Sequence, residues 1–132
     1  MSVRYTDERQ FTAQQLESLF LSVSWESGKY PERLKKALDN CGTVFTAWDG
    51  GELVGLANAI DDGEMTAYVH YLLVRPDHQG QGIGTALVDL MKRKYADYHN
   101  FFLVAEHKEL VGYYKALGFI EQSETSVMLY KE

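Results

Sequence analysis

The sequence has 132 residues but only one cysteine, Cys41, so it can form neither an internal disulfide nor a cysteine cluster that holds zinc. No apolar run approaches the length of a membrane span, and the first residues lack the apolar core of a signal peptide. Low-complexity segments, linkers and repeats are absent as well. We therefore expect one cytoplasmic domain over residues 1–132, with no metal and no membrane partner.

Basic residues are also scarce, because 13 Lys and Arg face 19 Asp and Glu, for a net charge of −6. No basic stripe is visible that could bind a phosphate backbone, so nucleic acid is not expected as a partner. The same negative charge is compatible with a small cationic substrate such as an amine. Apolar content of 45% and aromatic content of 13% are typical of a folded globular protein.

Local patterns predict a mixed, mostly antiparallel sheet with helices on both faces, in the α/β (α+β) class. Thr12 and Gln15 form a capping box, and Pro31 fits the first position of a helix. Hairpins in the middle imply antiparallel pairing, and a crossover through a long helix permits one parallel pair. The expected elements are a strand at 3–5, two helices with Leu16, Leu19, Phe20, Val23, Leu34, Ala37 and Leu38 inward, strands at 43–48, 52–60 and 65–74, a helix to about 95, a buried strand at 101–105, a helix at 110–117, and strands at 119–120 and 127–130.

The most informative stretch is the glycine-rich turn from Gln79 to Gly84, which lies between a predicted strand and a predicted helix. The first N–H groups of a helix lack partners, and the helix dipole is positive there, so such a turn binds phosphate-like anions. A P-loop would need Lys where Thr85 stands, and the dinucleotide fingerprint fails at the same residue. The pattern that fits is Gln/Arg-x-x-Gly-x-Gly/Ala, met by Gln79, Gly82 and Gly84.

Two motifs in order resemble the GNAT superfamily of acetyl-CoA-dependent N-acetyltransferases. One is Val74-Arg75-Pro76 with the turn, within about residues 68–90, and the other is Tyr113 to Phe119, within about residues 101–119. The resemblance implies that the coenzyme A pyrophosphate lies on the N–H groups of the turn, and that the pantetheine arm pairs with the preceding strand. The implied acetyl-CoA-binding residues are Leu73, Val74, Gln79, Gly80, Gln81, Gly82, Gly84 and Thr85.

The resemblance also implies the catalytic groups. Tyr114, five residues before Phe119, would be the general acid that protonates the leaving thiolate, while Tyr113 stands where the family has an apolar aromatic. Regular alternation puts Tyr68, His70, Leu72 and Val74 on one face of the strand. His70 is the candidate base, directly or through water, because its reference pKa is near physiological pH. The alternative for His70 and both tyrosines is ordinary packing.

Two positions depart from the family or stay open. His107 stands where many relatives have an Asn that contacts the pantetheine arm. Asp61, Asp62 and Glu64 could attract a cation or relay a proton, although an Asp-Asp-Gly segment is more often only a turn. Cys41 has no neighbour in sequence that would activate a thiol, which favours direct attack in a ternary complex over an acyl-cysteine route.

The acceptor side offers aromatic residues and carboxylates, which suit a small aromatic or aliphatic amine. A protein, peptide-lysine or N-terminal acetyltransferase is the second possibility, and a module that binds acetyl-CoA without catalysis is the third. A homodimer is compatible with exposed final strands. The candidate acceptor residues are Trp25, Tyr30, Trp48 and Tyr68, with Glu26 and Asp61.

Overall fold

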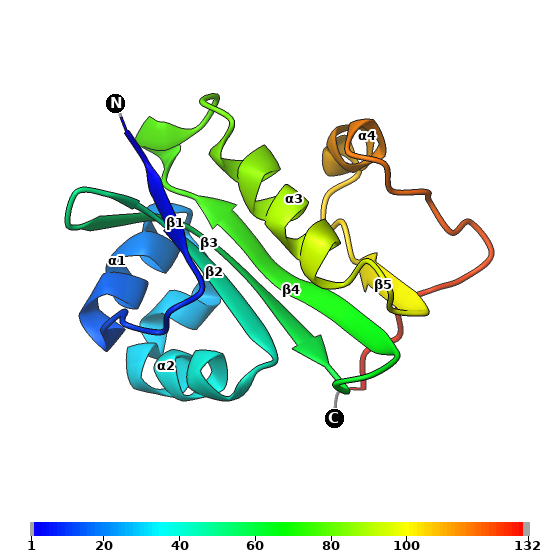
Figure 1. The fold of residues 1–132 in the computed structure, drawn as a ribbon, viewed down its shortest axis with the longest axis horizontal. Coiled ribbons are helices and arrows are strands. Elements are labelled where there is room, and N and C mark those ends of the chain that lie inside the picture. The colour runs from blue at the N-terminus through cyan, green and yellow to red at the C-terminus, as the bar shows by residue number, and fades with distance from the viewer. Residues whose placement is uncertain (1, 131–132) are drawn as a thin grey trace.

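The computed structural model describes residues 2–130 as a five-stranded sheet in the order β1-β2-β3-β4-β5, with helices against its faces (Figure 1). All neighbours are antiparallel except β4 and β5, which are parallel. This confirms the predicted fold class. The elements are β1 (Arg4–Thr6), α1 (Ala13–Ser22), η1 (Glu26–Lys29), α2 (Pro31–Asn40), β2 (Thr43–Asp49), β3 (Glu52–Asp61), β4 (Thr66–Val74), η2 (Pro76–His78), α3 (Ile83–Lys94), β5 (Asn100–Leu103) and α4 (Glu109–Ala116).

The first two helices begin where their capping residues predict. The Thr12 hydroxyl accepts from the Gln15 amide at 3.1 Å, and the Gln15 side chain accepts from the Thr12 amide at 2.8 Å. Pro31 occupies the first turn of α2, where a missing N–H costs nothing. One expectation is wrong: Ala37 is exposed, because the stripe of α2 that meets the sheet is narrow. The side chains buried from these helices are Leu16, Leu19, Phe20, Leu34 and Leu38.

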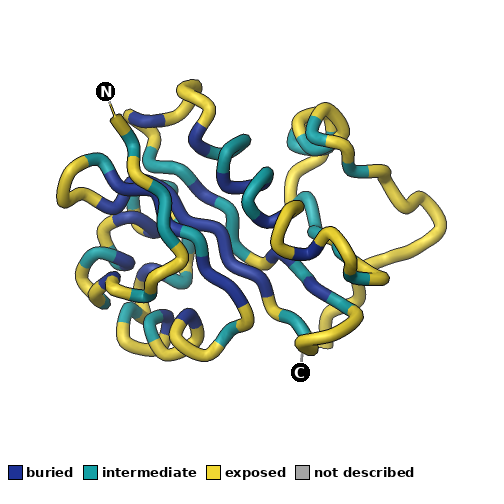
Figure 2. The backbone as a smooth tube through the Cα atoms, in the orientation of Figure 1, coloured by how far each residue is buried: buried dark blue, intermediate teal, exposed yellow. Residues whose placement is uncertain are grey.

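The sheet separates two hydrophobic cores. In Figure 2 the central strands between them form a band of buried backbone. The first core lies between the sheet and the pair α1 and α2, and includes Phe20, Leu56 and Leu73. The second lies under α3 and includes Leu87 and Met91, both 1% exposed or less. No helix among residues 2–130 is both long enough and apolar enough to cross a membrane.

A β-bulge interrupts β4 opposite Asn58. Ala57 pairs with Leu72 but Ala59 pairs with Val69, so two residues of β4, His70 and Tyr71, face one residue of β3. The Asn58 side chain accepts from the Tyr71 amide at 2.8 Å, which satisfies a donor that the ladder leaves free. The bulge is why His70 and Tyr71, neighbours in sequence, stack their rings 4.1 Å apart.

The bulge overturns the predicted face of β4. Regular alternation would place Leu72 and Val74 beside His70, but both pack against the second core, as Val69 does. Tyr71 packs against the first core together with Leu73. The extra residue shifts the alternation by one, so the face that carries His70 continues through Tyr71 rather than through Leu72.

The end of the chain also differs from expectation. Residues 119–130 form no strand, and β5 is not a buried strand, since Phe102 is 46% exposed. After α4 the chain turns at Gly118 (φ +102°), and a second turn follows, in which the Thr125 amide donates to the Gln122 carbonyl. An apolar segment becomes a strand only where a second backbone edge lies within hydrogen-bonding reach, and Val127–Tyr130 reaches none within residues 2–130.

Candidate active site

The glycine-rich turn has the backbone geometry that an anion site needs. Gly80 and Gly82 adopt φ values of +79° and +84°, a left-handed region that favours glycine, and both are exposed. Gly82 caps α3, whose first internal hydrogen bond runs from the Ala86 amide to the Gly82 carbonyl at 3.0 Å. The preceding N–H groups, from Ile83 through Thr85, have no intrahelical partner and line the start of the helix.

A tyrosine from α4 reaches this turn. A Cβ placed on Gly84 would lie 2.8 Å from the Tyr113 hydroxyl, so a side chain at 84 would require the Tyr113 ring to move. Tyr113 and Tyr114 therefore diverge: Tyr113 approaches the first turn of α3, and Tyr114 lines the cavity described below.

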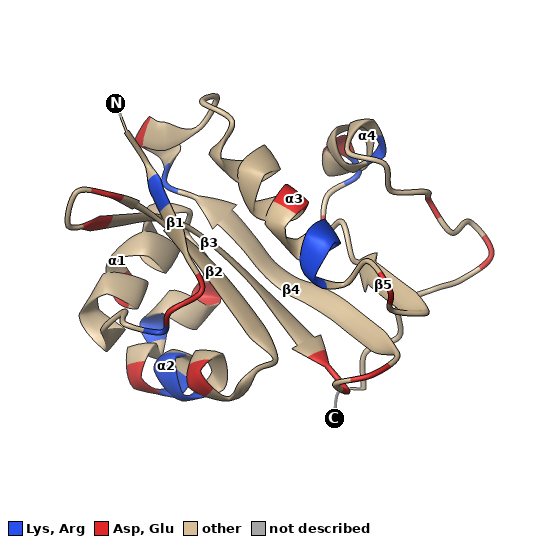
Figure 3. Cartoon of the chain, viewed as in Figure 1, with Lys and Arg blue, Asp and Glu red and all other residues tan. Residues whose placement is uncertain are grey.

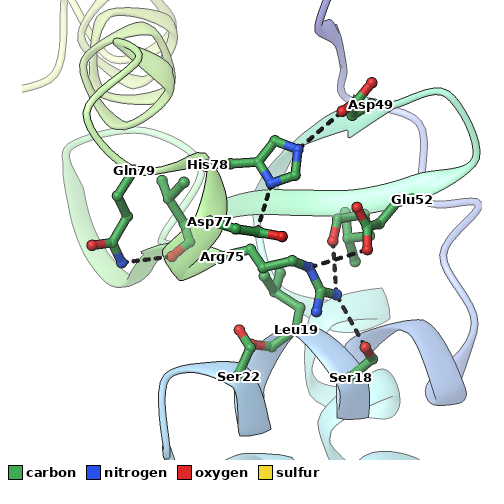
Figure 4. A network of polar contacts seen from close by, with 11 residues as sticks. Ser18, Leu19, Ser22, Asp49, Glu52, Arg75, Asp77, His78 and Gln79 are labelled. Atoms are coloured by element: carbon green, nitrogen blue, oxygen red, sulfur yellow. Dashed lines mark hydrogen bonds and ion pairs between the residues drawn. The ribbon is translucent and has the colours of Figure 1, made fainter.

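Polar contacts hold the segment before the turn (Figure 4). The His78 ring lies between two carboxylates, with Nε2 at 2.9 Å from Asp49 and Nδ1 at 2.7 Å from Asp77. The hydrogen bonds to Asp49 and Asp77 raise the pKa of His78 above its usual value. Because Asp49 ends β2, the buried His78 ties the β2–β3 hairpin to the chain that enters the turn.

Arg75 makes a second attachment at the same place. Its guanidinium donates to the Ser18 hydroxyl at 3.0 Å and to the Leu53 carbonyl at 3.2 Å, and its Nε lies 3.7 Å from Glu52 (Figure 4). The Gln79 side chain donates to the Val74 carbonyl at 2.9 Å. The backbone of the turn is thereby held by α1, β3 and the end of β4.

The outer edge of β4 is open where the pantetheine arm is expected. Pairing with β5 extends only from Thr66 to Val69, so the edge of β4 from 70 to 74 has no strand partner on that side among residues 2–130. Leu73 is buried in the first core and Val74 is half-buried against the second, so both present main chain rather than polar side chains. An extended ligand can pair with such an edge.

A cavity of about 350 Å³ lies where β4 and β5 separate. It brings together the two predicted catalytic residues, His70 from the bulge and Tyr114 from α4. His107, which stands at the Asn position of the family, lines the same cavity. The remaining lining residues come from the α1–η1 region, β4 and the β5–α4 segment: Ser24, Trp25, Glu26, Ser27, Val69, Tyr71, Leu72, Leu103, Val104, Glu106 and Leu110.

The surroundings of the cavity shift the pKa values of His70 and Tyr114 in opposite directions. Partial desolvation lowers the pKa of His70, and the carboxylate of Glu106 opposes this shift. Desolvation raises the pKa of Tyr114, and the neighbouring Tyr113 and Glu106 add to the rise. At neutral pH the imidazole is therefore neutral and able to accept a proton, while the phenol keeps its proton and can donate it.

Two residues of this cavity were missed by the sequence analysis. Glu106 follows β5 in an irregular segment, with no motif to mark it, yet its charge acts on Tyr68, His70 and Tyr114. Tyr71 enters the cavity only because of the bulge, and its hydroxyl lies 2.7 Å from the Ser27 hydroxyl. A glutamate near a histidine in the folded protein leaves no signal in the sequence when the two are far apart along the chain.

Several predicted acceptor residues lie elsewhere. Of the four aromatic candidates, Trp25 lines the cavity, and Tyr68 stacks on Phe102 with its centroid 5.7 Å from that of His70. Trp48 is buried in the first core, and Tyr30 is half-exposed under the guanidinium of Arg33. Neither lines the cavity.

The acidic turn and the cysteine also lie apart from the cavity. Asp61 accepts a hydrogen bond from the Tyr95 hydroxyl. Asp62 accepts from the amides of Glu64, Met65 and Thr66, so its carboxylate stabilises the turn. Figure 3 shows acidic residues at this end of the β3–β4 hairpin. Cys41 follows α2, with its Sγ against the Leu38 carbonyl, and does not line the cavity.

Residues 10–119 match the model of the Acetyltransferase (GNAT) family. The chain belongs to the GNAT acetyltransferase family. Among curated relatives, it is 31% identical over 117 residues to "Uncharacterized N-acetyltransferase ycf52" of Pyropia yezoensis, covering 83% of this chain and 66% of the relative. It is 36% identical over 97 residues to "Serotonin N-acetyltransferase 2, chloroplastic" of Oryza sativa subsp. japonica, covering 67% and 46%. This GNAT chain thus spans less than two thirds of the length of these relatives.

Solved structures agree on the fold. The GNAT family protein SP0256 from Streptococcus pneumoniae TIGR4 superposes with a TM-score of 0.87 at 25% identity, covering 99% of this chain and 98% of that one. AAC(6')-Iy, solved in complex with the bisubstrate analogue CoA-S-monomethyl-acetylneamine, superposes with a TM-score of 0.75 at 14% identity, covering 100% and 99%. At 14% identity, the match to AAC(6')-Iy shows only that the two chains share a fold.

Proposed function

We propose that this GNAT chain is an N-acetyltransferase that moves the acetyl group of acetyl-CoA to a small primary amine by direct attack in a ternary complex. The observation that supports it most is the shared cavity, in which a neutral His70 and a protonated Tyr114 lie beside the open edge of β4. The exposed turn at Gly80 and Gly82 provides the anion-binding N–H groups for the pyrophosphate. AAC(6')-Iy, which has the same fold, was solved in complex with a CoA-containing analogue.

The residues act in a definite order in this proposal. His70 accepts a proton from the ammonium form of the substrate, and the free amine nitrogen then attacks the thioester carbonyl carbon. Free N–H groups on the edge of β4 donate to the carbonyl oxygen as negative charge develops on it. The carbon–sulfur bond breaks, and Tyr114 donates its proton to the departing thiolate. The acylated nitrogen, which still carries one proton more than the amide product, gives that proton to the Tyr114 phenolate through solvent, and His70 releases its own proton to solvent.

The cavity supports a small cationic acceptor. Its volume of about 350 Å³ is at the lower end of the range of small-molecule sites. Trp25 and Tyr71 form an aromatic wall, with ring centroids 6.0 Å apart, and Glu26 and Glu106 add two carboxylates. Aromatic faces and carboxylates both attract an ammonium group.

A panel of amines tests the substrate class. Arylalkylamines, alkylamines, an aminoglycoside and lysine-containing peptides would each be incubated with acetyl-CoA, and release of free thiol would be measured. We expect turnover of small primary amines and little turnover of peptides. Turnover of peptide lysine alone would contradict the small-molecule proposal and favour the protein acetyltransferase.

Tyr114→Phe tests the catalytic role directly. Loss of the hydroxyl removes the acid but keeps the ring, so kcat should fall by about 10²–10⁴ while binding of acetyl-CoA, measured by calorimetry, stays the same. Tyr113→Phe is the matched control on the neighbouring position, and we expect it to keep most of the turnover. Unchanged kcat in Tyr114→Phe would refute the assignment of the acid.

A further inference from the structure

Asn58 is a polar side chain in an otherwise apolar stretch of the sheet. It is 2% exposed and lies on β3, where every residue from Leu53 to Ala59 is buried. A buried amide lowers stability unless its hydrogen bonds are made, and an aliphatic side chain of similar size would avoid that cost. Within residues 2–130 its side chain makes one hydrogen bond, from the Tyr71 amide at 2.8 Å, which is fewer than an amide can make. A core position that departs from the more stable choice indicates a functional requirement.

The hydrogen bond fixes one peptide group of β4. The Tyr71 N–H belongs to the planar group that joins His70 to Tyr71, so the direction of this N–H sets the direction of the whole group. The β-bulge shifts the pairing of β4 with β3 at this point, and the Asn58 side-chain oxygen accepts the hydrogen bond that the ladder leaves unmade. One side chain therefore holds the backbone at the residue that we assign as the base.

The His70 imidazole depends on this peptide group for its position. Among residues 2–130 no hydrogen bond is formed to a ring nitrogen of His70, and its pKa reflects desolvation and the charge of Glu106 alone. The ring is held by stacking, with its centroid 4.1 Å from that of Tyr71 and 5.7 Å from that of Tyr68. Tyr71 is itself fixed at its far end by the Ser27 hydroxyl. Backbone and stacking thus orient the base, in place of a bonded carboxylate.

The same peptide group precedes a free N–H at the open edge of β4. The Tyr71 amide points toward β3, and so does the Arg75 amide, which donates to the Val54 carbonyl at 2.8 Å. Because N–H groups alternate between the two edges of a strand, those of Leu72 and Val74 point toward the open edge. Leu72 lines the cavity, so its N–H belongs to the donors that the proposed reaction uses at the carbonyl oxygen.

We propose that Asn58 is a positioning residue for the acetyl transfer, because it fixes the peptide group between His70 and Tyr71. That group in turn holds the imidazole and the Leu72 N–H in the arrangement that the reaction needs. The inference rests on the proposed function, since it assigns Asn58 a role in that reaction. Asn58 does not line the cavity, so it acts only through the backbone of β4. The alternative is a bond that stabilises the bulge and has no effect on the chemistry.

Asn58→Leu tests the proposal, because leucine has a similar size but cannot accept from the Tyr71 amide. We expect kcat to fall by about 10–10²-fold, as a displacement of about 1 Å at a reacting group does, with acetyl-CoA binding retained in calorimetry. Asn58→Asp keeps an acceptor oxygen at the same place and should restore most of the turnover. Thr46→Val is the matched control, since the buried Thr46 hydroxyl accepts from the Trp48 indole at 2.9 Å outside the cavity. It should lose stability and keep kcat.

Two NMR measurements report the positioning without turnover. The Tyr71 amide should be protected from hydrogen exchange in wild type and Asn58→Asp, and should exchange faster in Asn58→Leu. The pKa of His70 should lie below its ordinary value in wild type and rise toward about 6.5 in Asn58→Leu, because a displaced ring loses its partial desolvation. Thr46→Val should leave both quantities unchanged. A bond that only stabilises the fold would not move the pKa of His70.

The outcomes separate this proposal from the proposed function. If Asn58→Leu frees the Tyr71 amide for exchange but keeps full kcat, the positioning role is wrong. If Asn58→Leu does not fold, Asn58→Ser decides in the same way, because its shorter side chain withdraws the oxygen from the Tyr71 amide, and an unchanged kcat would again overturn the proposal. If no variant and not even wild type turns over any amine, while the exchange and the His70 pKa respond as expected, only the proposed function fails.

Discussion

At the scale of single residues, Glu106 connects the groups of the cavity. Its carboxylate raises the pKa of Tyr68, His70 and Tyr114, which come from β4 and α4. For His70 the effect opposes desolvation, so the carboxylate keeps the imidazole from becoming too weak a base. For Tyr114 it adds to desolvation and keeps the phenol protonated. One negative charge therefore supports the base and the acid at the same time.

Glu106→Gln should weaken binding of the amine and move the pH profile. Loss of one exposed carboxylate should cost up to about 1 kcal/mol, or roughly fivefold in the KM of the amine. Because Glu106 raises the pKa of His70, its removal should shift the acid limb of kcat/KM to lower pH. Steady-state kinetics over the pH range measure both effects. Glu109→Gln, on the outer side of α4, serves as the control, and an unmoved acid limb would count against His70 as the base.

The sequence could predict the individual site residues only where a motif marks them. Tyr114 and His70 were found from spacing within the family motifs, and the structure places both in one cavity. Glu106 lies in the stretch that the second motif covers, but at a position that the motif does not specify, and its effect depends on how the segment between β5 and α4 lies beside β4. Tyr71 was hidden by the bulge, since regular alternation sends it to the other face.

At the scale of elements, the turn before α3 depends on a backbone conformation rather than on side chains. Gly82 caps the helix at φ +84°, and a Cβ there would meet no atom within 4 Å. The requirement for glycine is thus conformational in the free protein, and becomes steric only when a phosphate approaches the backbone.

Gly82→Ala should raise the KM for acetyl-CoA several-fold and lower the free energy of unfolding by about 1 kcal/mol, the cost of a left-handed alanine. The KM for the amine should not change, because the turn does not line the acceptor cavity. Gly51→Ala is the matched control, since Gly51 also has open space around it but no positive φ. Equal effects of the two substitutions on coenzyme binding would refute the role of the turn.

Helices and hairpins were predictable as elements, because their signals are local. The capping box at Thr12, the proline at Pro31 and the Asp49-Gly50-Gly51 turn each act within a few residues. The expected strands at 119–120 and 127–130 failed for the opposite reason. Apolar residues with strand propensity need a partner edge, and none in the described part of the single chain reaches them.

At the scale of the whole molecule, His78 links parts that are distant in sequence. It is buried between Asp49 of the β2–β3 hairpin and Asp77 of η2, next to the first residue of the turn. Unfolding separates His78 from Asp49 and breaks its hydrogen bond to the adjacent Asp77, so the protonated histidine loses both bonded carboxylates. The raised pKa of His78 is therefore a contribution to the stability of the fold.

The sign of this contribution sets a pH dependence. Because the folded pKa lies above the unfolded value near 6.5, the stabilisation is complete below about pH 6.5 and is lost as pH rises through the folded pKa. Urea unfolding of wild type from about pH 5.5 to about pH 9 should show a decline that His78→Asn lacks. His99→Asn, at an exposed histidine, is the control and should keep the decline. Parallel pH curves for wild type and His78→Asn would contradict this prediction.

The extra residue in β4 makes the length of this strand a functional quantity. Counted back from the turn, Leu73 must reach the first core, and Val69 must reach the second, although both have odd numbers. Removing one residue at the bulge would restore strict alternation and leave Val69 and Leu72 on the same face, so both cores would keep their side chains, but the position that lets His70 and Tyr71 share one side would be lost. A single insertion or deletion between the bulge and the glycine-rich turn would instead invert the face that His70 presents relative to that turn, so this part of β4 should tolerate exchange of side chains better than a change of length.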